Sequence, residues 1–407
     1  MSANVQPLIP QYSDEFIRIY RDGLLEDILP FWIEHSIDRE HGGFLTSLDR
    51  DGTVIDTDKS VWLQGRFVWM LATLHSTVDR YGMEPRPEWL QLAKHGVDFL
   101  DAHGFDEDGR MFFLLTRDGK PLRKRRYIFS ECFTIIAYAA YAQATADVDR
   151  LQRAVDLFKL TQHYLAAPGL LPPKTDPQTR PMKGIAVPMI MISTAQVLRG
   201  AGGDPELCNE PINRYIDEIE RDFMHPELRV VLEVVGPHGE FLDCFDGRTV
   251  TPGHAIEAAW FILDEAAHRG NDARLRQMGA TMLEWMWELG WDEEYGGLYY
   301  FRDVKGLPVQ EYWHDMKFWW PHNEAIIATL LAYQLTGDGT FAQWHTLAHE
   351  WAFRHFPDAE YREWFGYLHR DGSLSVPLKG NQWKGAFHVP RMYWKCWQIL
   401  EEMKSGR

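Results

Sequence analysis

The sequence contains six copies of a short pattern, which begin at intervals of 57 to 67 residues. Each copy has an acidic turn, a short aromatic or apolar stretch, and a second turn with Asp or Gly. Four copies are clear and two are degenerate: 38–52, 105–119, 291–306 and 357–372, then 169–181 and 226–241. Such a repeat restricts the fold to architectures in which similar units pack against their neighbours.

The segments between the copies predict helices, because their apolar residues recur with the helical period. Twelve of them lie near 11–35, 60–80, 86–103, 127–146, 149–166, 183–201, 207–223, 254–269, 271–289, 321–336, 339–354 and 386–404. We therefore expect an all-α (α/α)6 barrel of twelve helices, with short β-hairpin loops at one mouth and a single domain over residues 1–407. An open superhelix is the alternative, but its units usually repeat at roughly 34 to 47 residues.

Composition and charge exclude several classes of protein. With 45% hydrophobic and 25% charged residues, the chain is typical of globular proteins and unlike disordered, collagen-like or coiled-coil sequences. Its formal charge of −17 repels phosphate backbones and anionic lipids, so we expect no nucleic-acid or membrane partner. The sequence shows no leader-like segment and no membrane-spanning run, and its four cysteines lie far apart. These features predict a cytoplasmic protein with reduced thiols.

The aromatic content is high, at 14%, and falls into two groups. One group lies in the predicted hairpin loops, as in 112–113 and 299–301. The other interleaves with charged residues where inner helices should begin: Trp62, Trp313, Trp319, Trp320 and Phe387. Flat rings that cover C–H faces beside groups that bind hydroxyls are typical of a carbohydrate pocket. An aromatic core patch is the alternative interpretation of 313–324.

Charged residues at the same helix starts are candidate functional groups, because inner helices face a shared cavity. His254 and Glu257 are three residues apart before a buried-looking run, so the carboxylate can orient the imidazole; a surface pair is the alternative. His388 lies among apolar residues and is either a hydrogen-bonded core residue or a catalyst. Arg66 keeps its charge when buried and therefore needs Glu257, Glu324 or a ligand oxygen as its partner.

Other motifs are weak or absent. His345 and His349 could share a helix face as metal ligands, but a solvated outer helix is the simpler interpretation, and no H-E-x-x-H motif occurs. The sequence also lacks G-x-x-x-x-G-K-[ST], G-x-S-x-G and G-x-G-x-x-G motifs, which removes support for phosphate-loop, serine-hydrolase and dinucleotide-binding functions. We expect no metal site.

Several stretches, in order, make the chain similar to the N-acylglucosamine 2-epimerase family over nearly its full length. They are WLQGRFVWMLA, SECF, PGHAIEAAWFIL, DEEYGGLYYFRDVKG, HDMKFWWPHNEAI, EWFGYLHRDG and KGAFHVPR. The resemblance implies an (α/α)6 barrel, a homodimer, and interconversion of N-acetylglucosamine with N-acetylmannosamine. Relatives in this family epimerise cellobiose or isomerise mannose to fructose.

The resemblance also implies a mechanism and a set of site residues. After the sugar ring opens, one base removes the proton on C2 and a second delivers a proton to the opposite face; by resemblance these are His254 and His388. Arg66 would stabilise the enediolate, and Glu257 and Glu324 would orient the histidines or assist ring opening. The substrate-binding residues would be Trp320, Lys317, Trp62, Glu131 and Arg126.

Two departures from the family pattern bear on cofactor and substrate. Some members respond to ATP through a glycine- and lysine-rich loop, whereas 169–183 has no good phosphate cradle, so we expect no cofactor and no nucleotide activation. Relatives that act on mannose and cellobiose carry an additional pocket histidine near the helix that begins at Met182, where this chain reads KGIAVPMI. The absence of that histidine favours an acylhexosamine substrate.

The residues alone leave other functions open. Barrels of this kind often belong to glycoside hydrolases, with two of Glu257, Glu324 and Asp315 as the acid and the base. A mannose or cellobiose epimerase and an aldose–ketose isomerase use the same chemistry. A non-catalytic binding protein is a further alternative, because mammalian members of the family are also described as renin-binding proteins.

Overall fold

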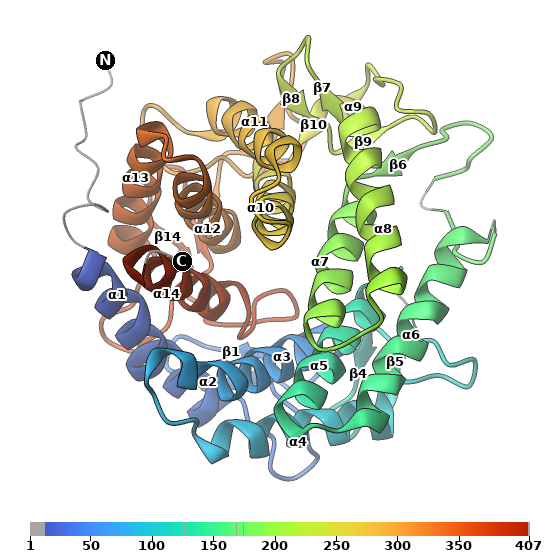
Figure 1. Ribbon diagram of the computed structural model, residues 1–407, viewed down its shortest axis with the longest axis vertical. Coiled ribbons are helices and arrows are strands. Elements are labelled where there is room, and N and C mark those ends of the chain that lie inside the picture. Colours follow the sequence, from blue (N-terminus) through green and yellow to red (C-terminus); the bar gives the residue numbers. More distant parts are fainter. Residues whose placement is uncertain (1–12, 125–126, 168, 174, 406–407) are drawn as a thin grey trace.

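The computed structural model describes residues 13–124, 127–167, 169–173 and 175–405, which form a ring of helices (Figure 1). Six inner helices are α3 (Val61–Thr77), α5 (Phe129–Thr145), α7 (Ala186–Gly200), α10 (Pro252–His268), α12 (Trp319–Thr336) and α14 (His388–Ser405). The outer segments are α1 (Ser13–Asp22) with η1 (Gly23–Ile28) and α2 (Leu29–His35), α4 (Pro87–His103), α6 (Val148–Ala166), α8 (Pro205–Glu218) with η3 (Ile219–Phe223), α11 (Ala273–Gly290) and α13 (Gly339–His355). For these residues the predicted (α/α)6 barrel of twelve helices is confirmed. One further turn, α9 (Phe245–Arg248), lies in a loop.

Inner and outer helices differ in how much of their surface is apolar. The inner helix α12 buries every residue from Trp319 to Ala332, as expected for a helix that is covered on all sides. The outer helix α6 buries only one stripe, at helical spacing: Ala154, Leu157, Phe158 and Thr161. The periodicity of the sequence therefore reports which layer of the barrel a helix occupies.

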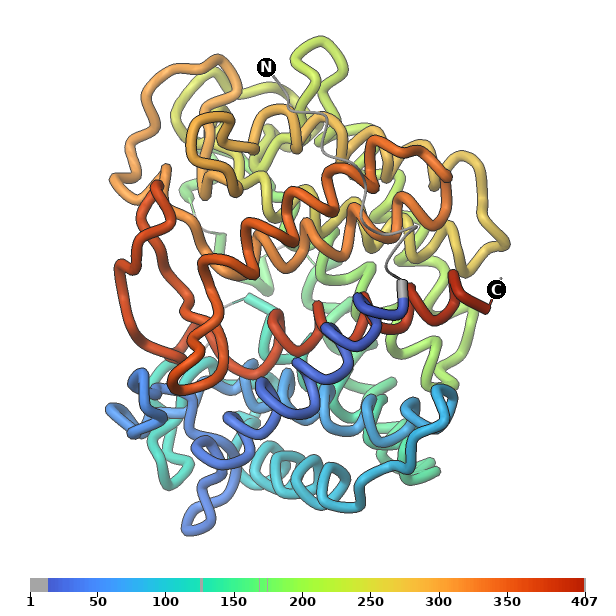
Figure 2. The backbone as a smooth tube through the Cα atoms, turned by 90° about the vertical axis from the view of Figure 1, so that its left-hand side faces the viewer, coloured from blue at the N-terminus to red at the C-terminus, as the bar shows by residue number. Residues whose placement is uncertain are grey.

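The two ends of the chain meet in the ring. The helices α1 and η1 lie along α14, as the neighbouring blue and red segments in Figure 2 show. Gly23 lies in this contact, where a side chain would collide with the ring of Tyr393. On the inner side, the ring of Trp69 in α3 lies 5.5 Å from Phe387 and 5.9 Å from Trp394. These contacts close the barrel between the first and last repeats.

Short antiparallel strands lie in the loops, which gather at one end of the barrel (Figure 2). The sheets are β1 (Ser47–Leu48) with β2 (Val54–Asp56); β3 (Lys59–Ser60), β4 (Leu114–Leu115) and β5 (Pro121–Arg123); β6 (Lys183–Gly184) with β9 (Val234–Val235); β7 (Met224–His225) with β8 (Val230–Val231); β10 (Thr249–Val250) with β11 (Arg302–Asp303); and β12 (Lys317–Phe318), β13 (Tyr367–Leu368) and β14 (Leu374–Val376). Because β3 pairs with β4 and β12 with β13, the sheets also join neighbouring units.

The degenerate copy at 169–181 departs from this pattern. Its described residues contain no strand, so the hairpin expected there is wrong. The segment contains four prolines, which offer no backbone N–H for a ladder: Pro172, Pro173, Pro177 and Pro181. Instead β6 pairs with β9, in the register Lys183 to Val235 and Gly184 to Val234, so this loop is joined to the degenerate copy that follows it.

In three units the acidic turn binds a lysine on the same loop. Each lysine ammonium and its aspartate are buried, and the N–O distances are 2.8, 3.0 and 3.0 Å for Lys59–Asp38, Lys317–Asp292 and Lys379–Asp358. The lysine lies between the hairpin and the inner helix that follows. This pair therefore ties each acidic turn to the start of an inner helix.

An arginine from the adjacent unit completes each of these ion pairs. Its Nε donates over 2.9, 2.8 and 2.8 Å in Arg117–Asp38, Arg370–Asp292 and Arg50–Asp358. Burial of the three carboxyl groups opposes their ionisation. The hydrogen bonds from lysine and arginine outweigh this effect and hold the pKa of each aspartate below its usual range. The pair Arg50–Asp358 joins the first unit to the last, so this network also spans the closure of the ring.

His345 and His349 were expected on a solvated helix face, and this prediction is wrong. They lie on the outer helix α13, but their side chains face α1 and are buried rather than solvated. The Tyr20 hydroxyl lies 3.2 Å from Nε2 of His345 and 2.8 Å from Nδ1 of His349. Burial lowers the pKa of His345 to about 4 and lowers that of His349 as well. Both imidazoles are thus neutral parts of the packing between outer helices.

The described residues bear on membrane-spanning helices and on the state of the cysteines. None of their helices combines the length and the apolar character that crossing a bilayer requires. The four cysteines are free thiols, as the spacing predicted, and three of them are buried: Cys132, Cys208 and Cys396.

Candidate active site

A cavity of about 580 Å³ opens where the inner helices begin. Its walls include the whole aromatic group expected at these helix starts: Trp62, Trp313, Trp319, Trp320 and Phe387. It is also lined by Arg66, His254, Glu257, His388 and Arg391, and by Glu233 of a loop. The aromatic group predicted at these helix starts thus lines one cavity, which gathers residues that are more than 300 positions apart in the sequence.

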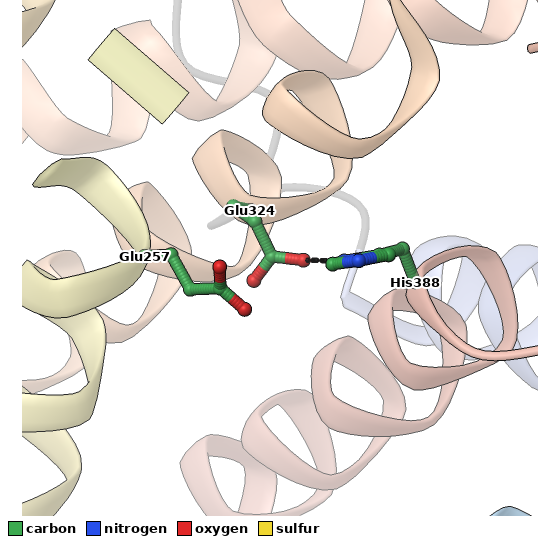
Figure 3. Close-up of side chains that lie close together, drawn as sticks. All are labelled: Glu257, Glu324 and His388. Carbon is green, nitrogen blue, oxygen red and sulfur yellow. Dashed lines mark hydrogen bonds and ion pairs between the residues drawn. The ribbon is translucent and has the colours of Figure 1, made fainter. Parts of the chain in front are cut away.

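His388 is held by a buried carboxylate. Its Nδ1 lies 2.7 Å from Oε1 of Glu324 (Figure 3). The Trp260 indole N–H donates to the other oxygen of Glu324 over 2.7 Å. Because a carboxylate only accepts, Nδ1 donates, and Nε2 is the nitrogen available to a ligand. Burial, followed by the charges of Arg391 and Arg66, holds the pKa of His388 well below its ordinary value. The imidazole of His388 is thus neutral at physiological pH.

Arg391 bridges the two carboxylates of the site. Its Nη2 donates to Oε1 of Glu257 over 2.5 Å and to Oε1 of Glu324 over 2.6 Å. One carboxylate oxygen of Glu257, one of Glu324 and a ring nitrogen of His388 lie within 4.8 Å of one another, and such a set of ligand atoms could hold a metal cation (Figure 3). The guanidinium already supplies the positive charge that this set requires. Sequence reasoning did not single out Arg391, although its position three residues after His388 places both on one helix face.

Arg66 lies among aromatic rings. Its guanidinium carbon is 4.9, 4.1 and 4.7 Å from the ring centroids of Trp62, Phe133 and Phe387. Among the described residues no carboxylate lies within ion-pair distance of it, and its Nε has no hydrogen-bond partner. Burial is the main cause that lowers the pKa of Arg66, to about 9. Of the three partners expected from the sequence, the geometry therefore favours a ligand oxygen.

His254 is oriented by a residue that the sequence did not suggest. Its Nδ1 lies 2.9 Å from Oε1 of Glu233, which lies between β8 and β9. The ring of Trp320 lies 4.9 Å from that of His254 and 5.9 Å from that of His388. Trp320 thus lies between two imidazoles that face one cavity. Glu257, expected to orient His254, accepts from Arg391.

Lys317, expected in the sugar pocket, is placed elsewhere. It is absent from the cavity walls, and its ammonium donates to Asp292 over 3.0 Å and to the carbonyl of Gly297 over 3.4 Å. It is the equivalent of Lys59 and Lys379 in the repeated ion pairs. A similar spacing between aspartate and lysine recurs in three units of the sequence. This spacing, rather than the aromatic neighbours of Lys317, indicates its role.

Glu131 is also placed behind the cavity rather than in its wall. It accepts from Nε of Arg110 over 2.6 Å and from the backbone N–H of Met111 over 3.1 Å. Gln64 on α3 accepts the backbone N–H of Phe44 in the same way, over 2.7 Å. Both side chains anchor a loop to the start of an inner helix, which accounts for a polar residue at that position.

Of the remaining sequence predictions, Arg126 lies outside the described residues. Trp62 and Trp320 line the cavity as expected. The helix α7, where an additional histidine was found to be missing, contributes only apolar and hydroxyl groups to the wall: Ala186, Met189, Ile190, Ser193 and Thr194.

Comparisons with known proteins identify the family of the chain. Residues 42–389 match the family model described as N-acylglucosamine 2-epimerase (GlcNAc 2-epimerase). The chain belongs to this family. It is 39% identical over 406 residues to the N-acylglucosamine 2-epimerase of Bos taurus, covering 97% of this chain and 94% of that protein. A cellobiose 2-epimerase of Bacteroides fragilis is 25% identical over 92% of this chain and 96% of that protein.

The fold is also found among solved structures. Cellobiose 2-epimerase from Bacillus thermoamylovorans B4167 superposes with a TM-score of 0.82 at 21% identity, covering 96% of this chain and all of that chain. This likeness supports the barrel architecture of the epimerase family member described here.

Proposed function

We propose that the protein is a sugar 2-epimerase that interconverts N-acetyl-D-glucosamine and N-acetyl-D-mannosamine. The observation that carries the proposal is the pair of imidazoles, His254 and His388, each hydrogen-bonded to a carboxylate and facing one cavity across Trp320. Membership of the epimerase family supports it. Inversion at one carbon requires proton removal on one face and delivery on the other, and two bases in one cavity provide this.

The chemistry follows from groups that the site holds. Opening of the sugar ring exposes an aldehyde at C1, which makes the C2 proton acidic. One imidazole takes that proton; the electron pair of the broken C–H bond moves into the C1–C2 bond, and the carbonyl oxygen becomes negative. Arg66 is buried, has no carboxylate partner in the part of the chain that the structure describes, and supplies the cation for that oxygen. The second imidazole then protonates C2 on the opposite face and the ring closes.

The wall formed by α7 bears on the substrate class. It offers apolar and hydroxyl groups and no imidazole, which favours an acylhexosamine over the mannose and cellobiose substrates of relatives. The identity of 39% to an N-acylglucosamine 2-epimerase, against 25% to a cellobiose 2-epimerase, supports the same choice.

The arrangement of the carboxylates argues against a glycoside hydrolase. Such an enzyme needs one carboxylic acid that can donate a proton. Both oxygens of Glu324 accept hydrogen bonds, and Asp315 does not line the cavity. Of the three candidates only Glu257 keeps an oxygen that could donate a proton there, so the required pair of carboxyl groups is not formed.

The proposal extends to a homodimer, as the family resemblance implies, and to a cytoplasmic protein that needs no metal, nucleotide or other cofactor, as the sequence predicts. Each step above uses only side chains of this chain, which supports the absence of a cofactor from the mechanism. Light scattering measures the assembly, and turnover in the presence of a chelator, with and without ATP, measures the cofactor requirement.

Proton NMR in heavy water tests the proposed function. A mixture of N-acetylglucosamine, mannose and cellobiose should yield N-acetylmannosamine that carries deuterium at C2, with little change in the other sugars. Appearance of a ketose would indicate an aldose–ketose isomerase instead. Release of monosaccharides without C2 exchange would indicate a hydrolase, and no change in any sugar would favour a binding protein.

A further inference from the structure

The cavity is deeper on one side of the barrel than on the other. Its wall extends from 129 to 136 on α5, from 186 to 194 on α7 and from 254 to 261 on α10. Each stretch covers about two helical turns, or roughly 10 Å. On α3 and α14 the wall spans about one turn and ends at Arg66 and Arg391. The cavity therefore has a deep arm, which is formed by Ile136, Met189, Ile190, Ser193, Thr194 and Phe261.

The deep arm differs in chemistry from the rest of the cavity. None of its side chains is charged, and within the described residues α5 and α7 bring no charged group to the cavity wall. These two helices are neighbours in the ring (Figure 1). The charged groups of the wall come instead from α3, α10 and α14, and from the loop that carries Glu233. The deep arm is thus an apolar recess beside a charged reaction centre.

The substituents of C2 differ in what they require from the cavity. In the proposed mechanism C2 becomes planar when its proton leaves, and the two bases act from opposite faces, so C1, C3 and the nitrogen all extend within the plane. The negative oxygen on C1 requires the cation of Arg66. The chain from C3 to C6 carries several hydroxyl groups, each of which needs a partner when it is buried. The acyl group has a single amide and an apolar end, which is the chemistry that the deep arm matches.

One hydroxyl of the deep arm is within reach of a ligand. The hydroxyl oxygen of Thr194 is buried, whereas Ser193 is only half-buried and lines the cavity. Ile190 lies three residues before Ser193 on the same face of α7. Its buried, branched side chain has few rotamers and gives the arm a fixed shape. The arm therefore offers one polar contact for an amide and one rigid apolar wall.

We propose that the deep arm is the subsite for the acyl group on the nitrogen of the sugar. Ile190 sets the length of the acyl chain that fits, and the hydroxyl of Ser193 binds the amide. A sugar with a hydroxyl group on C2 leaves the arm without its apolar occupant, so the arm selects acylhexosamines. This inference rests on the proposed function and names the residues that decide the substrate class.

A series of N-acylglucosamines of increasing chain length tests the proposal. Proton NMR in heavy water measures kcat/KM for the N-formyl, N-acetyl, N-propanoyl and N-butanoyl derivatives. The ratio between two substrates of one variant does not depend on how much of that variant is folded. I190A should raise the ratio of N-propanoyl to N-acetyl about 4-fold and that of N-butanoyl to N-acetyl about 15-fold, because each buried methylene contributes about 0.8 kcal/mol.

Two further variants test the shape and the polar contact of the arm. I190F should lower the ratio of N-acetyl to N-formyl about 4-fold, because the larger ring takes the place of the methyl group. S193A should lower kcat/KM for all four derivatives alike, by about 2- to 10-fold, because one neutral hydrogen bond is lost. An unchanged kcat/KM in S193A would remove Ser193 from the subsite.

The matched control is I192A, because Ile192 lies on the same helix, is fully buried and does not line the cavity. It removes the same side chain from the packing, and its substrate ratios should equal those of the unmodified protein. Unchanged ratios in I190A, or the same shift in I192A as in I190A, would overturn the proposal. Absence of deuterium at C2 of every derivative with the unmodified protein would instead refute the proposed function.

Discussion

Replacing Arg66 with Met should separate catalysis from stability. The guanidinium is buried, its Nε has no hydrogen-bond partner among the described residues, and burial lowers its pKa to about 9. Such a change corresponds to roughly 4 to 5 kcal/mol against the charged form. Cation–π contacts with the rings of Trp62, Phe133 and Phe387 stabilise the charged guanidinium by about 0.5 to 1 kcal/mol each. We therefore expect R66M to raise the free energy of unfolding by about 1 to 3 kcal/mol, which agrees with replacements of buried charges elsewhere.

The same substitution should remove the stabilisation of the negative oxygen at C1. Loss of one preorganised donor usually lowers kcat by about 10² to 10³, or roughly 3 to 4 kcal/mol. Calorimetry should show a melting temperature about 1 to 4 °C higher, given the unfolding entropy of a chain of this length, while NMR shows the slower turnover. R66K, which keeps the charge but lacks the planar fork, should retain more activity than R66M.

Two results would refute this reasoning. If R66M is less stable than the unmodified protein, the guanidinium has a structural partner, and if kcat stays within about five-fold, it does not face the reacting oxygen. The control is R80M, because Arg80 is exposed at the far end of α3 and should affect neither property.

Three further predictions follow from the site and the ring. H388N should abolish turnover but leave sugar affinity in calorimetric titration within a few-fold, and a large loss of affinity would mean that His388 mainly binds. The lowered pKa of His388 keeps it a neutral base as the pH falls through 6.5, so the acid limb of kcat/KM that belongs to this base should lie below that value; a limb above 6.5 would contradict its assignment. D358N should lower the free energy of unfolding by about 3 to 5 kcal/mol in urea, because Lys379 stays buried without its carboxylate. The pKa of Asp358 is lowered, so its contribution to stability is present above about pH 4 and is lost as the pH falls further; a cost of D358N that persists in acid would contradict this.

The helices and the aromatic wall could be predicted from the sequence because both follow from local patterns. The helical period marks each helix, and the alternation of fully buried α12 with striped α6 follows from the same period. Trp319 and Trp320 lie at a helix start beside charged residues, which identifies a cavity wall without knowledge of the partners across it.

The pairing of side chains could not be predicted, because it depends on which loops meet at the mouth. Lys317 and Glu131 are polar residues near the starts of inner helices, and the sequence alone does not distinguish them from residues that line the pocket. In the structure both side chains bind residues in loops of the repeat. Glu233 lies in an apolar strand-like run whose pairing with β6 has no local signal. His345 and His349 are buried by a helix from the opposite end of the chain.

The bridge made by Arg391 has a consequence for the order of folding. Glu257 and Glu324 come from α10 and α12, which are made before α14, and their oxygens lie within 4.8 Å of each other. Until the last helix docks, two carboxylates face one another with no cation between them, and they repel. Arrival of α14 supplies Arg391 and His388 in one step, so the attraction that seals the ring also completes the catalytic set. Removal of α14 should therefore leave the ring open and take His388 and Arg391 from the site together.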